Sequence, residues 1–155
     1  MNSLITFAGH FTERCAAGAK LLVPYITGGY PGWVDAVRAA VAAGADGIEI
    51  GIPFSDPVMD GPVIQQASQA ALDGGATPLT ILEAAAELDV AVPLAVMTYY
   101  NIVHHDGHRR FAGRLLAAGI SGCILPDLPL EESPPWTESA DDAGVETIML
   151  AAPTA

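Results

Sequence analysis

The sequence has 155 residues, of which 51% are hydrophobic and 15% are charged. This composition predicts one folded domain with a substantial core and excludes an intrinsically disordered chain. The formal net charge of −12 argues against a protein that binds nucleic acid or an anionic membrane surface.

The first twenty residues, MNSLITFAGHFTERCAAGAK, carry charges and lack the long apolar core of a signal peptide. We expect an amphipathic helix over about 2–18. No uninterrupted apolar stretch approaches the length of a membrane span. Cys15 and Cys123 have no partner at metal-ligand spacing, and Cys123 lies in an apolar run, where we expect it to be buried and inert. Such cysteine usage predicts a cytoplasmic protein.

One pattern recurs along the rest of the chain. An alanine-rich helical segment ends in glycine, and a short apolar run follows, as in VRAAVAAGADGIEIG, GRLLAAGISGCILPD and SADDAGVETIMLAAP. Glycine just after a helix adopts the left-handed conformation that other residues resist. Apolar runs without polar alternation are typical of strands that are buried on both faces of a parallel sheet.

The pattern predicts five strands that alternate with helices. The strands are expected at 21–27, 46–51, 93–99, 122–127 and 145–151, and the helices at about 32–44, 63–74, 78–88, 108–118 and 134–143. Thr77 and Ser133 are each followed by proline, which marks them as the caps of the helices expected at about 78–88 and 134–143. Two architectures fit this order: a doubly wound open sheet and a (β/α) barrel.

The lengths of the loops favour the barrel. The segments after strands are long and polar (52–62, 100–107 and 128–133), whereas those before strands are short. In (β/α) barrels the long loops at the carboxyl ends of the strands build the active site. We therefore expect an α/β fold in which residues 1–155 form the first five β/α units of a (β/α)8 TIM barrel, an incomplete barrel within one domain.

Two carboxylates are candidates for chemistry. Glu49 interrupts the apolar strand IEIG, and since Ile48 and Ile50 would point the other way, Glu49 would face the barrel interior. Burial without a cation raises a carboxyl pKa, as a general acid/base requires. Asp60 follows in a proline-rich loop that could carry it to a substrate. The alternatives are a solvated glutamate at a strand end and a turn aspartate in Asp-Gly.

Three other features suggest chemistry less strongly. Asp127 ends the fourth strand, where we expect it to fix a loop or face a partner. The segment HHDGH at 104–108 could suggest a metal site, but adjacent histidines in a loop diverge, and we expect a solvent-exposed loop with no bound metal. Lys20, the one lysine, precedes the first strand at the end opposite the expected active site, so we expect no Schiff base.

Four segments, PYITGGYP, IEIGIPFSDPVMDGPVIQ, VMTYYN and ILPDLPLEES, together resemble the tryptophan synthase alpha subunit family in order, in spacing and in position after successive strands. The pattern E-x-G-x-P-x-S-D-P-x-x-D-G-P is highly specific. The resemblance extends from about Lys20 onward. It implies a lyase that cleaves indole-3-glycerol phosphate to indole and glyceraldehyde 3-phosphate in tryptophan biosynthesis.

The resemblance also implies roles for individual residues. Glu49 would be the catalytic acid/base, and Asp60 would be the carboxylate that accepts a hydrogen bond from the indole N–H. The substrate-binding surfaces would come from Tyr25, Met97, Tyr99, Ile124 and Pro126. Asp56 and Asn101 would lie near the interface with a beta subunit. That partner would carry pyridoxal phosphate, and no cofactor is expected in this chain.

The chain departs from the family in length, because a barrel of this kind takes roughly 250 residues. The missing part would hold three strands and the phosphate site, so we expect little or no activity from this chain alone. Two alternatives to an alpha subunit are a stand-alone indole-3-glycerol phosphate lyase and a non-catalytic partial barrel that assembles with a partner.

Overall fold

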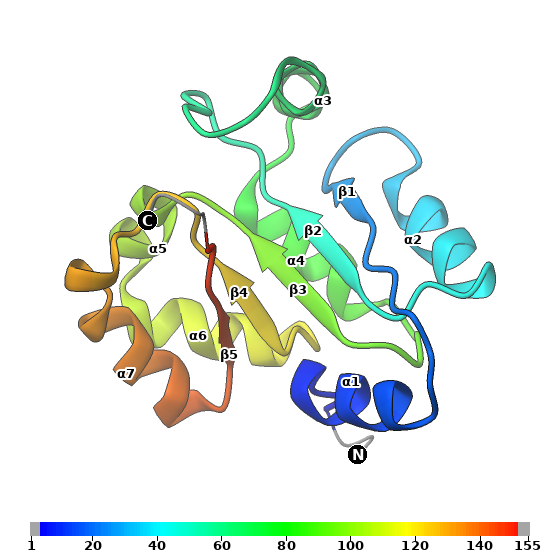
Figure 1. Ribbon diagram of the computed structural model, residues 1–155. Helices are drawn as coiled ribbons and strands as arrows, with labels where there is room; N and C mark the ends of the chain where they lie inside the picture. The colour runs from blue at the N-terminus through cyan, green and yellow to red at the C-terminus, as the bar shows by residue number, and fades with distance from the viewer. Residues whose placement is uncertain (1–3, 152–155) are drawn as a thin grey trace.

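The computed structural model describes residues 4–151, which contain one parallel sheet of five strands (Figure 1). The strands are β1 (Tyr25–Thr27), β2 (Ile48–Gly51), β3 (Leu94–Met97), β4 (Gly122–Ile124) and β5 (Glu146–Ile148). They lie in the sheet in the order β1-β2-β3-β4-β5. A doubly wound sheet reverses its strand order, whereas a barrel keeps it. The order confirms the barrel alternative.

Helices follow the strands in sequence and cover one face of the sheet. They are α1 (Phe7–Ala16), α2 (Trp33–Ala42), α3 (Pro62–Asp73), α4 (Pro78–Ala86), α5 (Tyr100–Asp106), α6 (His108–Ala117) and α7 (Pro134–Ala143), with a 3₁₀ turn η1 at Leu130–Glu132. The exception is α1, which lies below the amino ends of the strands in Figure 1. In residues 4–151, no helix is both long and apolar enough to cross a membrane.

The expected helices after the first strand begin and end within two residues of the observed ones. The amino-terminal helix is shorter than the expected 2–18, and residues 2 and 3 of that range lie outside the described residues. The strands are also shorter than expected: β1 covers only Tyr25–Thr27, although the carbonyls of Leu22 and Pro24 already accept hydrogen bonds from the β2 segment. Pro24 precedes Tyr25 and has no N–H to donate to a ladder.

One expectation for the loops is wrong. Residues 100–107 were expected to be a loop, but the structure forms helix α5 over Tyr100–Asp106. The start of this helix is held from outside the segment, because the backbone N–H of Tyr100 donates to Oδ1 of Asp127 at 2.9 Å. Asp127 therefore fixes the connection after β3, in agreement with the expected positioning role.

The predicted caps and helix ends differ in how they are built. Thr77 caps α4 through a reciprocal pair of bonds with Thr80. Ser133 also precedes a helix, but its hydroxyl donates to the carbonyl of Leu130 and not to the helix it precedes. The helix-ending glycines Gly119 and Gly144 have φ of 74° and 80°, which confirms the left-handed turns expected there.

The two faces of the sheet differ in what covers them. On the outer face, Ile48, Ile50 and Val96 are fully buried against the helices. The inner face carries a small cluster in which Phe7 of α1 packs with Ala95 and Ile124. Because α1 fills the inner face only at the amino ends of the strands, the carboxyl ends of the strands remain open toward the inner side.

Candidate active site

The alternation of β2 places Glu49 on the inner face. Its neighbours Ile48 and Ile50 are both 0% exposed on the helix-covered side, whereas Glu49 is only partly buried. In the sheet register Glu49 lies between Tyr25 of β1 and Ala95 of β3. Side chains at paired positions of parallel strands share a face. The orientation expected for Glu49 is therefore the one that the structure has.

The Glu49 carboxylate has no hydrogen-bond or ion-pair partner among residues 4–151. Burial raises its pKa above the ordinary value, and no cation is close enough to lower it again. Partial desolvation disfavours the charged form of a carboxyl group, so the group holds a proton more readily near neutral pH. Such a group can both donate and accept a proton, as a general acid/base must.

Asp60 comes from the loop after β2, which is anchored to the end of β3. The backbone N–H of Met59 donates to the hydroxyl of Tyr99 at 2.9 Å, and the ring of Phe54 stacks on Tyr99 with centroids 5.1 Å apart. Burial raises the pKa of the Asp60 carboxyl, and the hydrogen bond that the Tyr99 hydroxyl donates to it has a smaller, lowering effect. Asp60 is thus a second carboxylate with a raised pKa.

Tyr25 lies close to these groups. Its pKa is raised mainly by burial, and the negative charges of Asp60 and Glu49 add to the shift. The ring lies over Gly51, where a Cβ atom would overlap it, and its hydroxyl accepts a bond from Thr27 at 3.4 Å. The structure therefore brings Glu49, Asp60, Tyr99 and Tyr25 to one place.

The three other expected binding residues line the same end of the sheet. Met97 and Ile124 pair in register on the inner face, two residues beyond the row of Glu49. Ile124 is 7% exposed and serves mostly as core, while Met97 is half-buried. Pro126 follows β4 and is also half-buried. Their aliphatic and thioether surfaces are suited to contact with a flat apolar ring.

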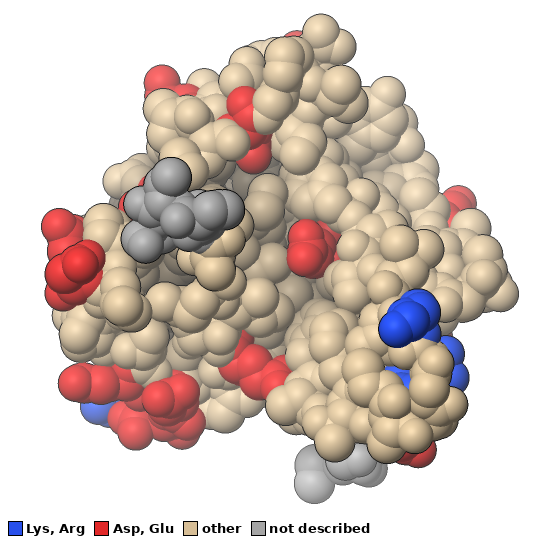
Figure 2. All heavy atoms as spheres, viewed as in Figure 1, with Lys and Arg blue, Asp and Glu red and all other residues tan. Residues whose placement is uncertain are grey.

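The charge on this side of the molecule is negative. Figure 2 shows a face that is hollowed near its centre, with Asp and Glu atoms in, above and below the hollow and Lys and Arg atoms only at the lower right and lower left of the face. Lys20 is exposed and precedes β1, at the amino ends of the strands. Carboxylates are therefore the only charged groups that the described residues bring to the carboxyl end of the sheet near Glu49.

The two positions assigned to a partner interface are both exposed. Asp56 lies in the loop after β2, where it accepts a bond from the Ser55 hydroxyl at 2.7 Å. Asn101 lies in the first turn of α5. Just after Asp56 the same loop exposes the apolar side chains of Val58 (79%) and Met59 (53%). Exposed apolar groups beside polar ones are typical of protein-binding surfaces.

The histidines of the HHDGH segment lie apart from this site and not in a loop. His104 is in the last turn of α5, and His108 is the first residue of α6. His108 Nε2 is 2.9 Å from the Tyr100 hydroxyl. Across residues 4–151, no group of three His, Cys, Asp or Glu side chains could hold a metal ion.

Sequence reasoning missed the residues that support the site. Phe54 and Gly51 were not singled out, although one buttresses Tyr99 and the other leaves room for Tyr25. A signal for Gly51 was present, because a glycine at an inward-facing position of a strand, two residues after Glu49, often marks a close approach of another group. Phe54 offered no comparable signal in a loop rich in proline.

A parallel β/α sheet with its strands in sequential order, and with Glu49 and Asp60 on the side of the carboxyl ends of its strands, defines the class of (β/α) barrel proteins. Residues 11–155 match the sequence model of the tryptophan synthase alpha chain family. The chain belongs to this family.

Curated relatives agree with this assignment. The chain is 44% identical to the tryptophan synthase alpha chain of Streptomyces coelicolor over 142 residues, which covers 88% of this chain and 52% of the relative. It is 45% identical to that of Thermobifida fusca over 146 residues, covering 92% of this chain and 54% of the relative. The chain thus spans about half the length of the curated relatives it matches.

Solved structures share the fold. Tryptophan synthase subunit alpha from Legionella pneumophila superposes with a TM-score of 0.91 at 35% identity, over 95% of this chain and 58% of that one. A tryptophan synthase from M. tuberculosis, a ligand-free mutant form, gives a TM-score of 0.90 at 38% identity, over 95% of this chain and 61% of the other. The five β/α units are therefore part of a TIM-barrel fold.

Proposed function

We propose that this chain supplies the acid/base groups of a lyase that cleaves indole-3-glycerol phosphate to indole and glyceraldehyde 3-phosphate. The observation that carries the proposal is the convergence of Glu49 and Asp60, both with raised pKa values, beside Tyr25 and Tyr99. Membership in the tryptophan synthase alpha chain family supports the choice of substrate.

The reaction breaks one carbon–carbon bond. Glu49 in its acid form gives a proton to the indole ring carbon that bears the side chain, and as a base it takes the hydroxyl proton of the adjacent carbon. That hydroxyl becomes the carbonyl of the aldehyde product, and the electron pair of the broken bond returns to the indole ring. Asp60 accepts a hydrogen bond from the indole N–H while positive charge develops on the indole nitrogen. Within residues 4–151, neither carboxylate forms an ion pair with a basic side chain.

The proposed chemistry needs no cofactor in this chain. We propose that the exposed loop with Asp56, Val58 and Met59, together with Asn101, faces a beta subunit, which would carry the pyridoxal phosphate. The exposed apolar side chains of the loop support this assignment. The two free cysteines, Cys15 and Cys123, fit a cytoplasmic enzyme.

The test is a chimera, because the chain spans about half the length of its relatives. Residues 1–155 are joined to the remaining barrel segment of the Streptomyces coelicolor relative, and indole release from indole-3-glycerol phosphate is measured. The 155-residue chain alone is assayed beside it. We expect turnover by the chimera, and a loss of at least about 100-fold in kcat for Glu49→Gln, in the range that general acid/base catalysis contributes.

The matched control is Glu146→Gln, the same substitution in the same row of the inner face. It should leave kcat within about threefold, because the carboxylate of Glu146 bonds to backbone and not to the hollow. A folded Glu49→Gln chimera that retains its turnover would contradict the proposal. A Glu49→Gln chimera that loses stability instead would favour the non-catalytic partial barrel.

A further inference from the structure

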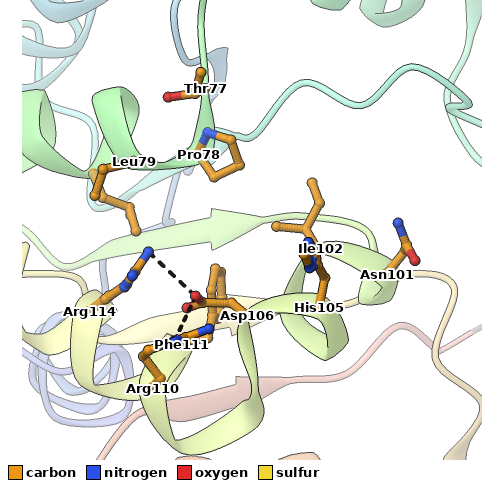
Figure 3. A pocket seen from close by; sticks show the side chains of 11 residues that line it. Thr77, Pro78, Leu79, Asn101, Ile102, His105, Asp106, Arg110, Phe111 and Arg114 are labelled. Carbon is orange, nitrogen blue, oxygen red and sulfur yellow. Dashed lines mark hydrogen bonds and ion pairs between the residues drawn. The ribbon is translucent and has the colours of Figure 1, made fainter.

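A cavity of about 330 Å³ lies on the outer side of the sheet, away from Glu49 and Asp60. Helices α4, α5 and α6 form its walls (Figure 3). The lining residues from α4 and its cap are Thr77, Pro78, Leu79 and Leu82; those from α5 are Asn101, Ile102, His105 and Asp106; those from α6 are Arg110, Phe111 and Arg114. None of these residues takes part in the proposed lyase chemistry, and Asn101 alone is also assigned to the proposed partner interface.

Positive charge is concentrated in this cavity. Two of the six basic residues of a chain with a net charge of −12 converge on it. Arg110 Nε lies 2.9 Å and Arg114 Nη1 3.5 Å from the same oxygen of Asp106. The other oxygen of Asp106 is buried, so the carboxylate shows little of its charge to the cavity. Two guanidinium groups against one carboxylate leave one net positive charge at the wall.

The two arginines retain donors for a ligand. A guanidinium has five N–H groups, and the ion pair of Arg110 uses Nε alone. The side chains of Arg110 and Arg114 are 63% and 42% exposed, so their remaining N–H groups are accessible. His105 and the amino end of α4 add to the same wall, and a helix amino end also favours negative charge.

The rest of the cavity is apolar. Leu82 and Phe111 are almost completely buried behind it, and Leu79 and Ile102 extend along its sides, as Figure 3 shows. Small-molecule sites commonly combine such walls with a few polar groups that fix orientation. The volume of about 330 Å³ lies at the lower end of the range for such sites.

We propose that this cavity binds a small organic anion, with its carboxylate or phosphate group on Arg110 and Arg114 and its flat apolar body between Leu79, Ile102 and Phe111. The site is separate from the proposed lyase site, and its test does not depend on lyase activity. Planar anionic groups suit guanidinium forks, which bind carboxylate and phosphate alike.

The experiment titrates the 155-residue chain with benzoate and with phenyl phosphate, and follows backbone amide shifts by ¹H–¹⁵N NMR. Benzyl alcohol and benzylamine serve as neutral and cationic probes with the same ring. We expect shifts confined to residues 77–82 and 101–114 for at least one anion, and the stronger anion identifies the head group. Binding should weaken as salt is raised, because the arginines are partly exposed.

Three variants test the wall. Arg110→Gln and Arg114→Gln each leave the other ion pair to Asp106 intact, and each should weaken anion binding by at least about tenfold. The matched control is Arg109→Gln on the same helix, since Arg109 is 85% exposed and pairs with Asp142 outside the cavity. It should change affinity less than about twofold.

The proposal is overturned by any of three results. The first is no saturable shift at these residues with either anion, and the second is equal binding of benzyl alcohol. The third is an equal loss in Arg109→Gln. The comparison of charged and neutral probes on the unmodified chain decides the matter even where an arginine variant does not fold.

Discussion

Carboxylates at the two ends of the sheet differ in their hydrogen-bond partners, and their pKa values shift in opposite directions. At the amino ends, Asp46 accepts bonds from the backbone N–H of Leu22 at 3.0 Å and from Arg14 at 2.9 Å. The Leu22 bond first, and Arg14 second, hold the Asp46 pKa below its usual value. At the open carboxyl ends, Glu49 has no such donor among the described residues, and burial raises its pKa.

Glu146 shows that position on the inner face alone does not decide the role. It stands in the same sheet row as Glu49, three strands away. Its two carboxylate oxygens accept bonds from the backbone N–H groups of Phe7 at 2.6 Å and Ala8 at 2.8 Å, in the first turn of α1. A carboxylate at a helix amino end is stabilised by the helix dipole. Carboxylates bonded to backbone N–H groups thus hold α1 and the segment before β1 to the sheet, whereas Glu49 at the open end has no such bond among the described residues.

After the loss of turnover expected for Glu49→Gln, the next largest effect on activity is expected for a substitution of Asp60. In the chimera, Asp60→Asn should lower kcat/KM for indole-3-glycerol phosphate by about 100-fold or more, because a neutral amide stabilises developing positive charge poorly. The control is Asp56→Asn, the same substitution in the same loop at an exposed position. Equal losses in the two variants would show that the loop, and not the Asp60 charge, matters.

Tyr99→Phe tests how the open end is held together. The variant removes the hydroxyl that accepts the Met59 N–H and contacts Asp60. The loss of one such bond is worth about 1 kcal/mol, so kcat/KM of the chimera should fall about fivefold. Tyr100→Phe is the control, because that hydroxyl faces His108 instead. A smaller effect from Tyr99 than from Tyr100 would break the link between this hydroxyl and the site.

The bonds between Glu146 and the first turn of α1 should contribute to the stability of the fold. Glu146→Gln in the 155-residue chain should lower the free energy of unfolding by about 1 kcal/mol, because two charge-assisted bonds to α1 become weaker. Urea denaturation followed by circular dichroism measures it. Glu138→Gln on the exposed side of α7 is the control and should change the free energy of unfolding by less than about 0.5 kcal/mol.

The smallest effect that we expect is an increase in the free energy of unfolding, in Glu49→Gln. The folded-state pKa of Glu49 is raised above its ordinary value of 4.5, so its contribution to stability is full below that pH and is lost as pH rises through the raised folded pKa. Glu49→Gln should therefore be more stable than the unmodified chain at neutral pH, with the advantage shrinking toward about pH 4. Urea midpoints at several pH values measure it. An advantage that grows toward acid would contradict the raised pKa.

Much of this arrangement could be predicted from the order of residues. The run Ile48-Glu49-Ile50 has the period of a strand, which is enough to place the glutamate opposite the core. Glycines after alanine-rich segments gave the helix ends and hence the β/α alternation. Loop lengths then placed Asp60 on the same side as Glu49.

The rest depends on contacts between segments that are distant in the sequence. Helix α5 was missed because its first N–H is accepted by Asp127, which lies 27 residues away. The roles of Asp46 and Glu146 were missed because their donors come from the segments around Arg14 and Phe7. Local propensity cannot register such tertiary partners. For the same reason, the sequence did not predict the hydrogen bond from the Met59 N–H to the Tyr99 hydroxyl, which anchors the loop after β2.

The most direct measurement is a site-resolved titration of the side-chain carboxyl ¹³C signals of Asp46 and Glu49 in the 155-residue chain by NMR. Both report from the segment around β2, under the same conditions and in the same sample. We predict a midpoint below the ordinary value of 3.8 for Asp46 and one above 4.5 for Glu49. A Glu49 midpoint at or below 4.5 would contradict the claim that the open end of the sheet holds an unpartnered acid/base.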